Sequence, residues 1–353
     1  MVINNGFKFS NLTGDCFIEN GTLVCESWHI VQVYDASTEN RVLLDALAVN
    51  YEHDKDIINF TKKYGPLIAW SLSSVSENDF QLLHNAIETE SYQAFKNNHF
   101  GRYDINLFRN IFIRLQDLVN LITAYKQKDF PNMLHYCLTL ILNAPAQSNN
   151  EYNQNATADF STDFESAKEL LNDKPLIKII KDFINTPNIY SVTEHELEVP
   201  FFIKLLLNTC TLCEKQNLSV ENIVDTKLDS DITLYIKQIS DFTSTLQICS
   251  GIIIADEINF VVCNIKPFFR IQSNGDFLGD WIIPDLISAL YLDIFLKNAN
   301  SILLKKCSNP TCSEYFETTI ENTSKKYCST RCAQLMAKRK QREREKEKKT
   351  KFS

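Results

Sequence analysis

Cys307-Ser-Asn-Pro-Thr-Cys312 and Cys328-Ser-Thr-Arg-Cys332 are two cysteine pairs separated by fifteen residues. The Cys-x4-Cys and Cys-x3-Cys spacings leave enough chain between the pairs for a β-hairpin. Such paired thiols are typical of a tetrahedral Zn²⁺ site, because each pair supplies two ligands and the hairpin brings the pairs together. No histidine lies in this region, so we predict one structural zinc ion held by Cys307, Cys312, Cys328 and Cys332. The alternatives are four unligated thiols or two disulfides.

Residues beside the cysteines fit the same interpretation. Pro310 lies inside the first pair, where the chain must bend and no ladder N–H is needed. Tyr315 and Phe316 supply the aromatic cover that a module too small for a core of its own requires.

A strongly basic segment follows the fourth cysteine. Residues 333–337 are good helix formers and continue without a breaker into residues 338–351, which hold nine Lys and Arg against three Glu. The whole chain carries a net charge of −8, so residues 1–337 carry −14 and the segment 338–351 carries +6. A basic helix attached to a zinc module is a candidate nucleic-acid contact; the alternative is a solvated tail.

The order of these features resembles the CGNR zinc-finger family, whose bacterial members are thought to regulate transcription and carry a larger N-terminal domain. Beside the four cysteines, the resemblance rests on the residues Asn309, Pro310, Tyr315, Phe316, Tyr327, Ser329 and the basic run from Lys338. Where the family has Cys-Gly-Asn-Arg, this chain has Cys332-Ala333-Gln334-Leu335. The resemblance therefore implies the metal site, but no base or phosphate contact by the family's Asn and Arg.

Composition predicts a globular body ahead of the finger. Hydrophobic residues make up 44% of the 353 residues, and 8 Gly and 9 Pro favour helices over a turn-rich β-sandwich. The eleven cysteines lack a disulfide-like framework, which favours a reducing compartment. The sequence also lacks a signal-peptide pattern and an apolar run approaching about 20 residues. We therefore predict a cytoplasmic protein outside the membrane. We predict an α+β fold, mainly helical with small antiparallel sheets, divided into an acidic body (1–300), a four-cysteine zinc finger (301–337) and a basic tail (338–353).

Within the body, Asn20-Gly21 predicts a hairpin in which Cys16 and Cys25 face each other, as free thiols rather than a disulfide in a reducing compartment. Residues 30–34 predict a further strand. The helices that apolar periodicity and breakers predict span residues 54–64, 105–125, 134–142 and about 200–213, with one more starting after Ser76 and others between 164 and 184. Residues 144–163 are amide-rich and predict a loop.

Residues 231–272 predict a small antiparallel sheet. Ile232, Leu234 and Ile236 alternate with polar residues, and three apolar stretches at 252–254, 260–265 and 268–271 are separated by turn-forming residues. Pro284 is expected to open a buried helix that runs to about Lys297 and leads directly into the finger.

The sequence holds no G-x-S-x-G elbow, no phosphate-binding Gly-rich loop and no H-E-x-x-H, which favours a protein that is not an enzyme. His195 among Glu194, Glu196 and Glu198 is interpreted as part of a solvated connection. Cys210 and Cys213 form a lone Cys-x2-Cys, interpreted as core packing.

The sequence thus favours a cytoplasmic DNA-binding transcription regulator, whose body senses a ligand or forms a homo-oligomer; RNA is the weaker choice of nucleic acid. The residues predicted to meet phosphates are Lys338, Arg339, Lys340, Arg342 and Arg344, with Arg331 and Gln334 as base contacts. The alternative is a protein-interaction module, in which the finger caps the body and the tail docks on an acidic partner.

Overall fold

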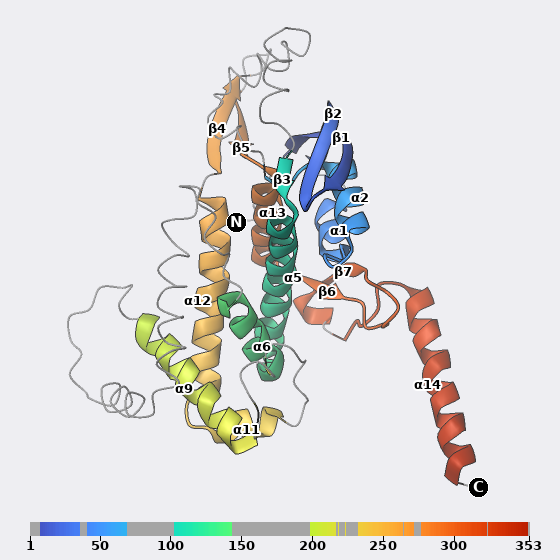
Figure 1. Cartoon of the computed structure of the whole chain (residues 1–353). Coiled ribbons are helices and arrows are strands. Elements are labelled where there is room, and N and C mark those ends of the chain that lie inside the picture. The colour runs from blue at the N-terminus through green and yellow to red at the C-terminus, as the bar shows by residue number, and fades with distance from the viewer. Residues whose placement is uncertain are drawn as a thin grey trace, which may run out of the picture. The chain divides into compact units, whose positions relative to one another are not determined.

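The computed structural model describes residues 8–35, 41–68, 102–142, 198–216, 218, 223, 232–263, 265–271, 277–322 and 324–351. Contacts divide the chain into two compact units (Figure 1). The first unit comprises residues 1–113 and 261–353, and the second comprises residues 114–260. The finger therefore lies in the same unit as the N-terminal sheet. The boundary predicted after residue 300 stays a prediction.

The first unit begins with an antiparallel hairpin of β1 (Lys8–Glu19) and β2 (Thr22–Asp35). Asn20 and Gly21 both have positive φ, 50° and 77°, as the predicted two-residue turn requires. Cys16 is paired directly with Cys25, with their Sγ atoms 2.8 Å apart, and both are free thiols in the structure. The further strand predicted at residues 30–34 is instead the continuation of β2. The pairing of β1 with β2 shifts register at Thr13 and then continues to the end of the hairpin, as β-bulges allow.

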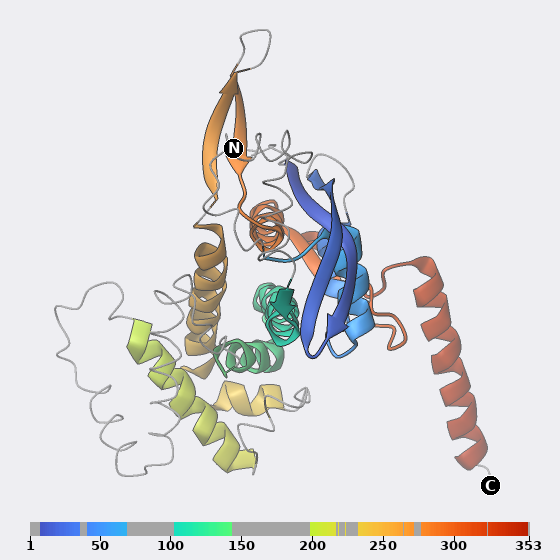
Figure 2. The same ribbon diagram turned by 45° about the horizontal axis from the view of Figure 1, so that its top comes forward.

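Helices pack against this hairpin. The helices α1 (Val42–Ala48) and α2 (Asp54–Tyr64) lie beside it in both views (Figures 1 and 2). The buried Asn11 side chain of β1 donates to the backbone oxygens of Tyr64 and Pro66, which fixes the end of α2 to the sheet. Gly65, with φ of 83°, ends α2 at the predicted residue.

The rest of the first unit surrounds this core. Strand β3 (Arg102–Asp104) adds to β2 and leads into α5 (Ile105–Gln127), whose Phe112 ring stacks edge-on against Phe60 at 5.3 Å. Strands β4 (Lys266–Ile271) and β5 (Phe277–Ile282) form a two-stranded ribbon. Helix α13 (Leu286–Ala299) is capped by the Asp285 carboxylate, which accepts from the Ser288 N–H. It confirms the predicted buried helix that leads into the finger.

The second unit is helical. It contains residues 114–127 of α5 together with α6 (Phe130–Leu142), α9 (Glu198–Gln216), α11 (Ile232–Gln238) and α12 (Phe242–Val262). Arg114 forms a mostly buried ion pair with Glu257 of α12 and donates to the Leu140 oxygen of α6. The thiol of Cys137 on α6 contacts the Ser250 hydroxyl of α12 at 3.1 Å. These polar contacts join α5, α6 and α12.

The predicted strands at 232–236 and 252–254 are wrong, because α11 and α12 occupy them, and the strand predicted at 260–265 is wrong over residues 260–262, which end α12. In α11, Ile236 is buried while Leu234 is 64% exposed, so the alternating pattern does not define a face. The apolar stretches of α12 are β-branched, but their combined length is that of a helix, and short apolar runs do not distinguish a buried helix from a strand. Gly251, predicted as a turn, lies within α12, where a Cβ would meet the Tyr125 hydroxyl oxygen at 3.8 Å. Only β4 with β5 confirms the predicted sheet.

Among the described helices, α12 has the length and apolar character needed to cross a membrane, judged by length and composition alone. It spans 21 residues with a mean hydropathy of 1.4, so it comes closer to a membrane span than the sequence predicted. The core helix of a soluble protein passes the same test. The absence of a membrane partner therefore stays a prediction.

Several predictions lie outside the described residues. They are the helix after Ser76, the loop at 144–163, the helices at 164–184, the His195 cluster and the Asn274-Gly275 turn.

Candidate zinc centre and nucleic-acid interface

The cysteines are carried by a short ribbon and a helix. Strand β6 (Ile302–Lys306) pairs with β7 (Tyr315–Thr319), and the 3-10 helix η4 (Ile320–Asn322) follows. Cys307 continues β6, and its N–H bonds to the Glu314 oxygen, so the first pair forms a closed knuckle at the end of the ribbon. The last two cysteines stand at the start of α14 (Thr330–Lys351).

The structure brings the four predicted ligands together. The Sγ atoms of Cys307, Cys312, Cys328 and Cys332 all lie within 4.8 Å of one another. Cys328 Sγ lies 3.7 Å from both Cys312 Sγ and Cys332 Sγ. A tetrahedron with Zn–S bonds of about 2.3 Å has sulfur–sulfur edges of about 3.8 Å, so the donors match zinc in type, number and separation.

Two N–H donors hold the sulfurs in place, one from the Asn309 side chain and one from the Cys328 backbone. The buried Asn309 side chain donates through Nδ2 to Cys332 Sγ at 3.5 Å, while its Oδ1 accepts from the hydroxyl of Thr311. The Cys328 N–H points at Cys307 Sγ, also at 3.5 Å. Each bond crosses from one cysteine pair to the other, so the two halves of the site orient each other.

The thiols of the site differ in pKa, and this difference favours the binding of a cation. The Asn309 amide, followed by the Ser329 hydroxyl, lowers the pKa of the Cys332 thiol to about 7. Desolvation raises the pKa of the Cys312 thiol and raises that of Cys328 to about 12. Four neighbouring thiols cannot all ionise without a cation between them, so zinc binding releases protons and its affinity falls as the pH falls.

The basic helix is attached to the metal site through its first turn. Ser329 is the N-cap of α14, and its Oγ accepts from the N–H of Cys332, a zinc ligand. Cys332 is buried, and Ala333 and Met336 are half-buried, so these three residues mark the side of α14 that faces the finger. Beyond Met336, every side chain that the structure describes, up to Lys346, is exposed.

All seven predicted nucleic-acid contacts lie on α14 and are exposed, but helical geometry separates them. At 100° per residue, Arg331, Gln334, Lys338 and Arg342 share the face opposite the finger side. Lys340 and Arg344 lie on the finger side, and Arg339 lies between the two. The sequence prediction divided them into phosphate and base contacts, but not by the face of the helix.

The finger also binds the rest of its unit through charges that the sequence did not indicate. Glu314 pairs with Arg41 at 2.7 Å, next to α1, and Glu317 pairs with Lys297 of α13 at 2.7 Å. Lys297 also contacts Asp293 at 3.4 Å. Burial alone would lower the pKa of Lys297, but these carboxylates outweigh it and raise the pKa. Tyr315 and Phe316 are buried, as predicted for the aromatic cover.

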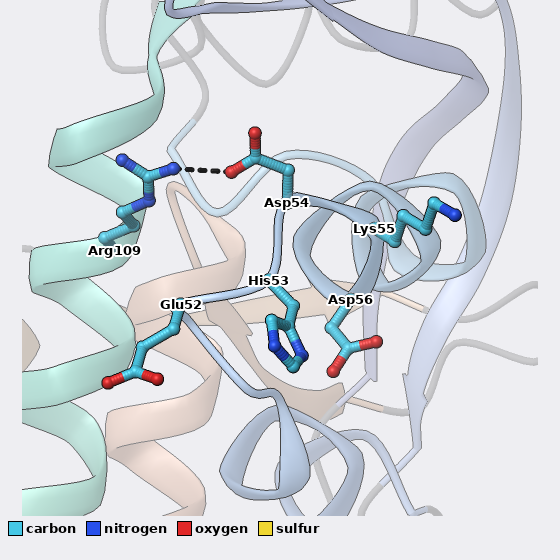
Figure 3. A pocket seen from close by; sticks show the side chains of 6 residues that line it. All are labelled: Glu52, His53, Asp54, Lys55, Asp56 and Arg109. Carbon is cyan, nitrogen blue, oxygen red and sulfur yellow. Dashed lines mark hydrogen bonds and ion pairs between the residues drawn. The ribbon is translucent and has the colours of Figure 1, made fainter.

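A hollow of about 420 Å³ lies elsewhere in the first unit (Figure 3). Charged side chains from the start of α2, together with Arg109 of α5, line it, and Arg109 donates to Asp54 at 2.5 Å. Nothing in its lining distinguishes it from a solvated surface with an ion pair.

The ribbon, the four clustered sulfurs and the capped helix define a zinc finger with four cysteine ligands. The model of the CGNR zinc finger matches residues 304–345, so the C-terminal part of this chain is a CGNR zinc finger. No curated protein and no solved structure matches the chain.

Proposed function

We propose that this chain is a zinc-dependent DNA-binding protein that regulates transcription in the cytoplasm. The observation that carries the proposal is the junction at Ser329 and Cys332, where a zinc ligand and an N-cap fix the first turn of an exposed basic helix. The match to the CGNR zinc finger supports it. The zinc ion has no catalytic part in this proposal, because four thiolates leave no open coordination position on the metal.

Every side chain of α14 that the structure describes from Ala337 to Lys346 is exposed to solvent. A helix that is polar on all sides gains no stability from packing. Its stability therefore comes from contact with another molecule or from i,i+4 pairs such as Gln341 with Glu345. Because the helix is densely basic, a polyanion is the partner that fits it, and duplex DNA presents regularly spaced phosphates.

The contact face proposed is the one turned away from the finger, with Arg331, Gln334, Lys338 and Arg342. Lys338 and Arg342 meet phosphates, and Arg331 or Gln334 reaches a base edge. Together with flanking cations, on the order of four to six ionic contacts give a slope of log affinity against log salt of about −4 to −5.

The test is fluorescence anisotropy of labelled duplex DNA titrated with zinc-loaded protein at several salt concentrations. Two matched variants change the same charge on the same helix: Lys338→Gln with Arg342→Gln, and Lys340→Gln with Arg344→Gln. The first pair flattens the slope by about 2, and the second pair changes it less. Equal effects of the two pairs would contradict the proposed face, and a wild-type protein that binds no duplex at low salt would contradict the function.

A protein-interaction module is the second candidate. The ion pairs of Glu314 with Arg41 and of Glu317 with Lys297 favour it, because they join the finger to other elements of its own unit. In that case the basic helix binds an acidic protein surface. Deletion of the residues after Ala337 would then leave any affinity for DNA unchanged.

A further inference from the structure

The finger itself is basic, apart from α14. Residues 301–329, ahead of α14, contain four Lys and three Glu, a net charge of +1. Two of these carboxylates, Glu314 and Glu317, are paired with Arg41 and Lys297, which lie outside the finger. The negative charge of the finger is therefore largely directed toward the rest of the first unit.

The ribbon separates Glu317 from a group of lysines. In the β6–β7 register, Lys305 is opposite Phe316 and Leu304 is opposite Glu317. Opposed residues share a face and successive residues alternate, so Lys305 and Phe316 lie on the face opposite to Glu317. The ion pair with Lys297 and the lysines thus belong to different faces of the ribbon.

Two more lysines gather at the face that carries Phe316. Lys325 Nζ lies 4.9 Å from the centre of the Phe316 ring, a cation–π contact. The Lys326 backbone oxygen accepts from the N–H of Ser308, which fixes Lys326 beside the first knuckle. Lys305 is opposite the same Phe316 in the ribbon, so the three lysines lie at the end of the ribbon that carries the first knuckle. We call Lys305, Lys325 and Lys326 the lysine cluster.

Like charges held close together repel, and an anion between them relieves the repulsion. The lysine cluster is held by the metal centre, because Lys305 precedes Cys307 by two residues and Lys326 precedes Cys328 by two. Lys325 and Lys326 are exposed and accessible to a ligand, while Lys305 is half-buried.

We propose that the lysine cluster is a second phosphate-binding surface, which engages the backbone of the same duplex DNA as α14. This inference rests on the proposed function and extends it from the helix to the ribbon of the finger. Ammonium groups act on phosphates as point charges, so the lysine cluster contributes affinity without sequence preference. The base contacts remain with α14.

The experiment uses the full-length, zinc-loaded protein and two labelled duplexes of unrelated sequence. The variant is Lys305→Gln, Lys325→Gln and Lys326→Gln combined. The control combines Lys55→Gln, Lys215→Gln and Lys237→Gln, three exposed lysines outside the finger, which changes the net charge equally. The cluster variant flattens the salt slope by about 2 to 3 on both duplexes, at about 0.9 per lost contact. The control leaves the slope within error.

A slope equal to that of the control overturns the inference, and so does a loss of affinity on only one duplex. If deletion after Ala337 still flattens the slope, the proposed function stands without the lysine cluster. If the wild-type protein binds neither duplex, the result overturns both the inference about the lysine cluster and the proposed function. Zinc content is measured for each variant. If the triple variant loses zinc, Lys325→Gln with Lys326→Gln takes its place, with two thirds of the effect expected.

Discussion

Asn309 shows at the scale of a residue how the metal site is held. Its Nδ2 donates to the Cys332 sulfur, and its Oδ1 accepts from Thr311, so the side chain connects the first knuckle to the start of α14. We expect Asn309→Ala to weaken zinc binding by about 10- to 100-fold, the usual effect of losing a group that orients a ligand. Competition with a chelator measures it, with Ser324→Ala as the control. An unchanged affinity would show that Asn309 only fills space.

Asp117 of α5 provides a test of the second unit that is independent of zinc. Desolvation raises the pKa of its carboxyl group to about 7, against the opposing effect of Arg114. Because the folded pKa lies above the unfolded value of about 4, the stabilisation is complete at low pH and is lost as the pH rises through 7.

The expected change in the free energy of unfolding is on the order of a few kcal/mol between pH 4 and pH 8. Asp117→Asn removes the titration, so the variant gains stability over the wild type as the pH rises. Urea denaturation at pH 4.5, 6 and 8 compares the two proteins. Parallel stability curves would contradict the account of Asp117.

Residue roles were predictable where local spacing determines them. The ligands follow from the two cysteine pairs, and the cover by Tyr315 and Phe316 follows from the small size of the module. The role of Asn309 and the pairing of Glu317 with Lys297 were not predictable, because each needs two segments brought together by the fold.

At the scale of an element, Ser329 determines how α14 begins. Its hydroxyl accepts from the N–H of Cys332, which no helical oxygen satisfies. We expect Ser329→Ala to cost about 1 kcal/mol and to speed hydrogen exchange of that amide by roughly fivefold. Ser329→Asp keeps an acceptor and is the matched control. Equal exchange in both variants would show that zinc alone fixes the first turn.

Helices with a clear apolar face were predicted well, whereas α12, which lacks one, was predicted as strands. Residues 105–125 repeat their apolar side chains at helical spacing, and α5 occupies them. Helix α12 is apolar on nearly every side, so its β-branched stretches have the sequence pattern of strands. Its helical structure depends on contacts with α5 and α6, which local sequence does not indicate. Helix α1 carries no strong periodic signal in its seven residues and was not predicted.

The whole molecule combines an acidic body with a basic end. Residues 1–337 carry −14 and residues 338–351 carry +6, so the body repels DNA while the tail attracts it. The ion pairs of Glu314 and Glu317 hold the finger to the first unit. Such a chain brings only its C-terminal end to a polyanion.

We expect a protein truncated after Asn300 to stay folded, because both units have buried cores outside the finger. Its melting temperature falls by a few degrees, because Lys297 loses its pair with Glu317 and the side of α13 that faces the finger is uncovered. Circular dichroism and thermal unfolding measure both quantities. Expression only as aggregate would show that the finger is an integral part of the first unit.

Zinc-dependent DNA binding is tested most directly by one titration. Protein stripped of metal by a chelator is mixed with labelled duplex, and zinc is added back in steps while anisotropy is recorded. We predict no binding before zinc, full binding at one equivalent per chain, and no recovery in Cys328→Ser. The control Cys263→Ser, altered at an exposed cysteine outside the finger, recovers like the wild type. Metal-free protein that binds duplex as tightly as the zinc-loaded form would contradict the account.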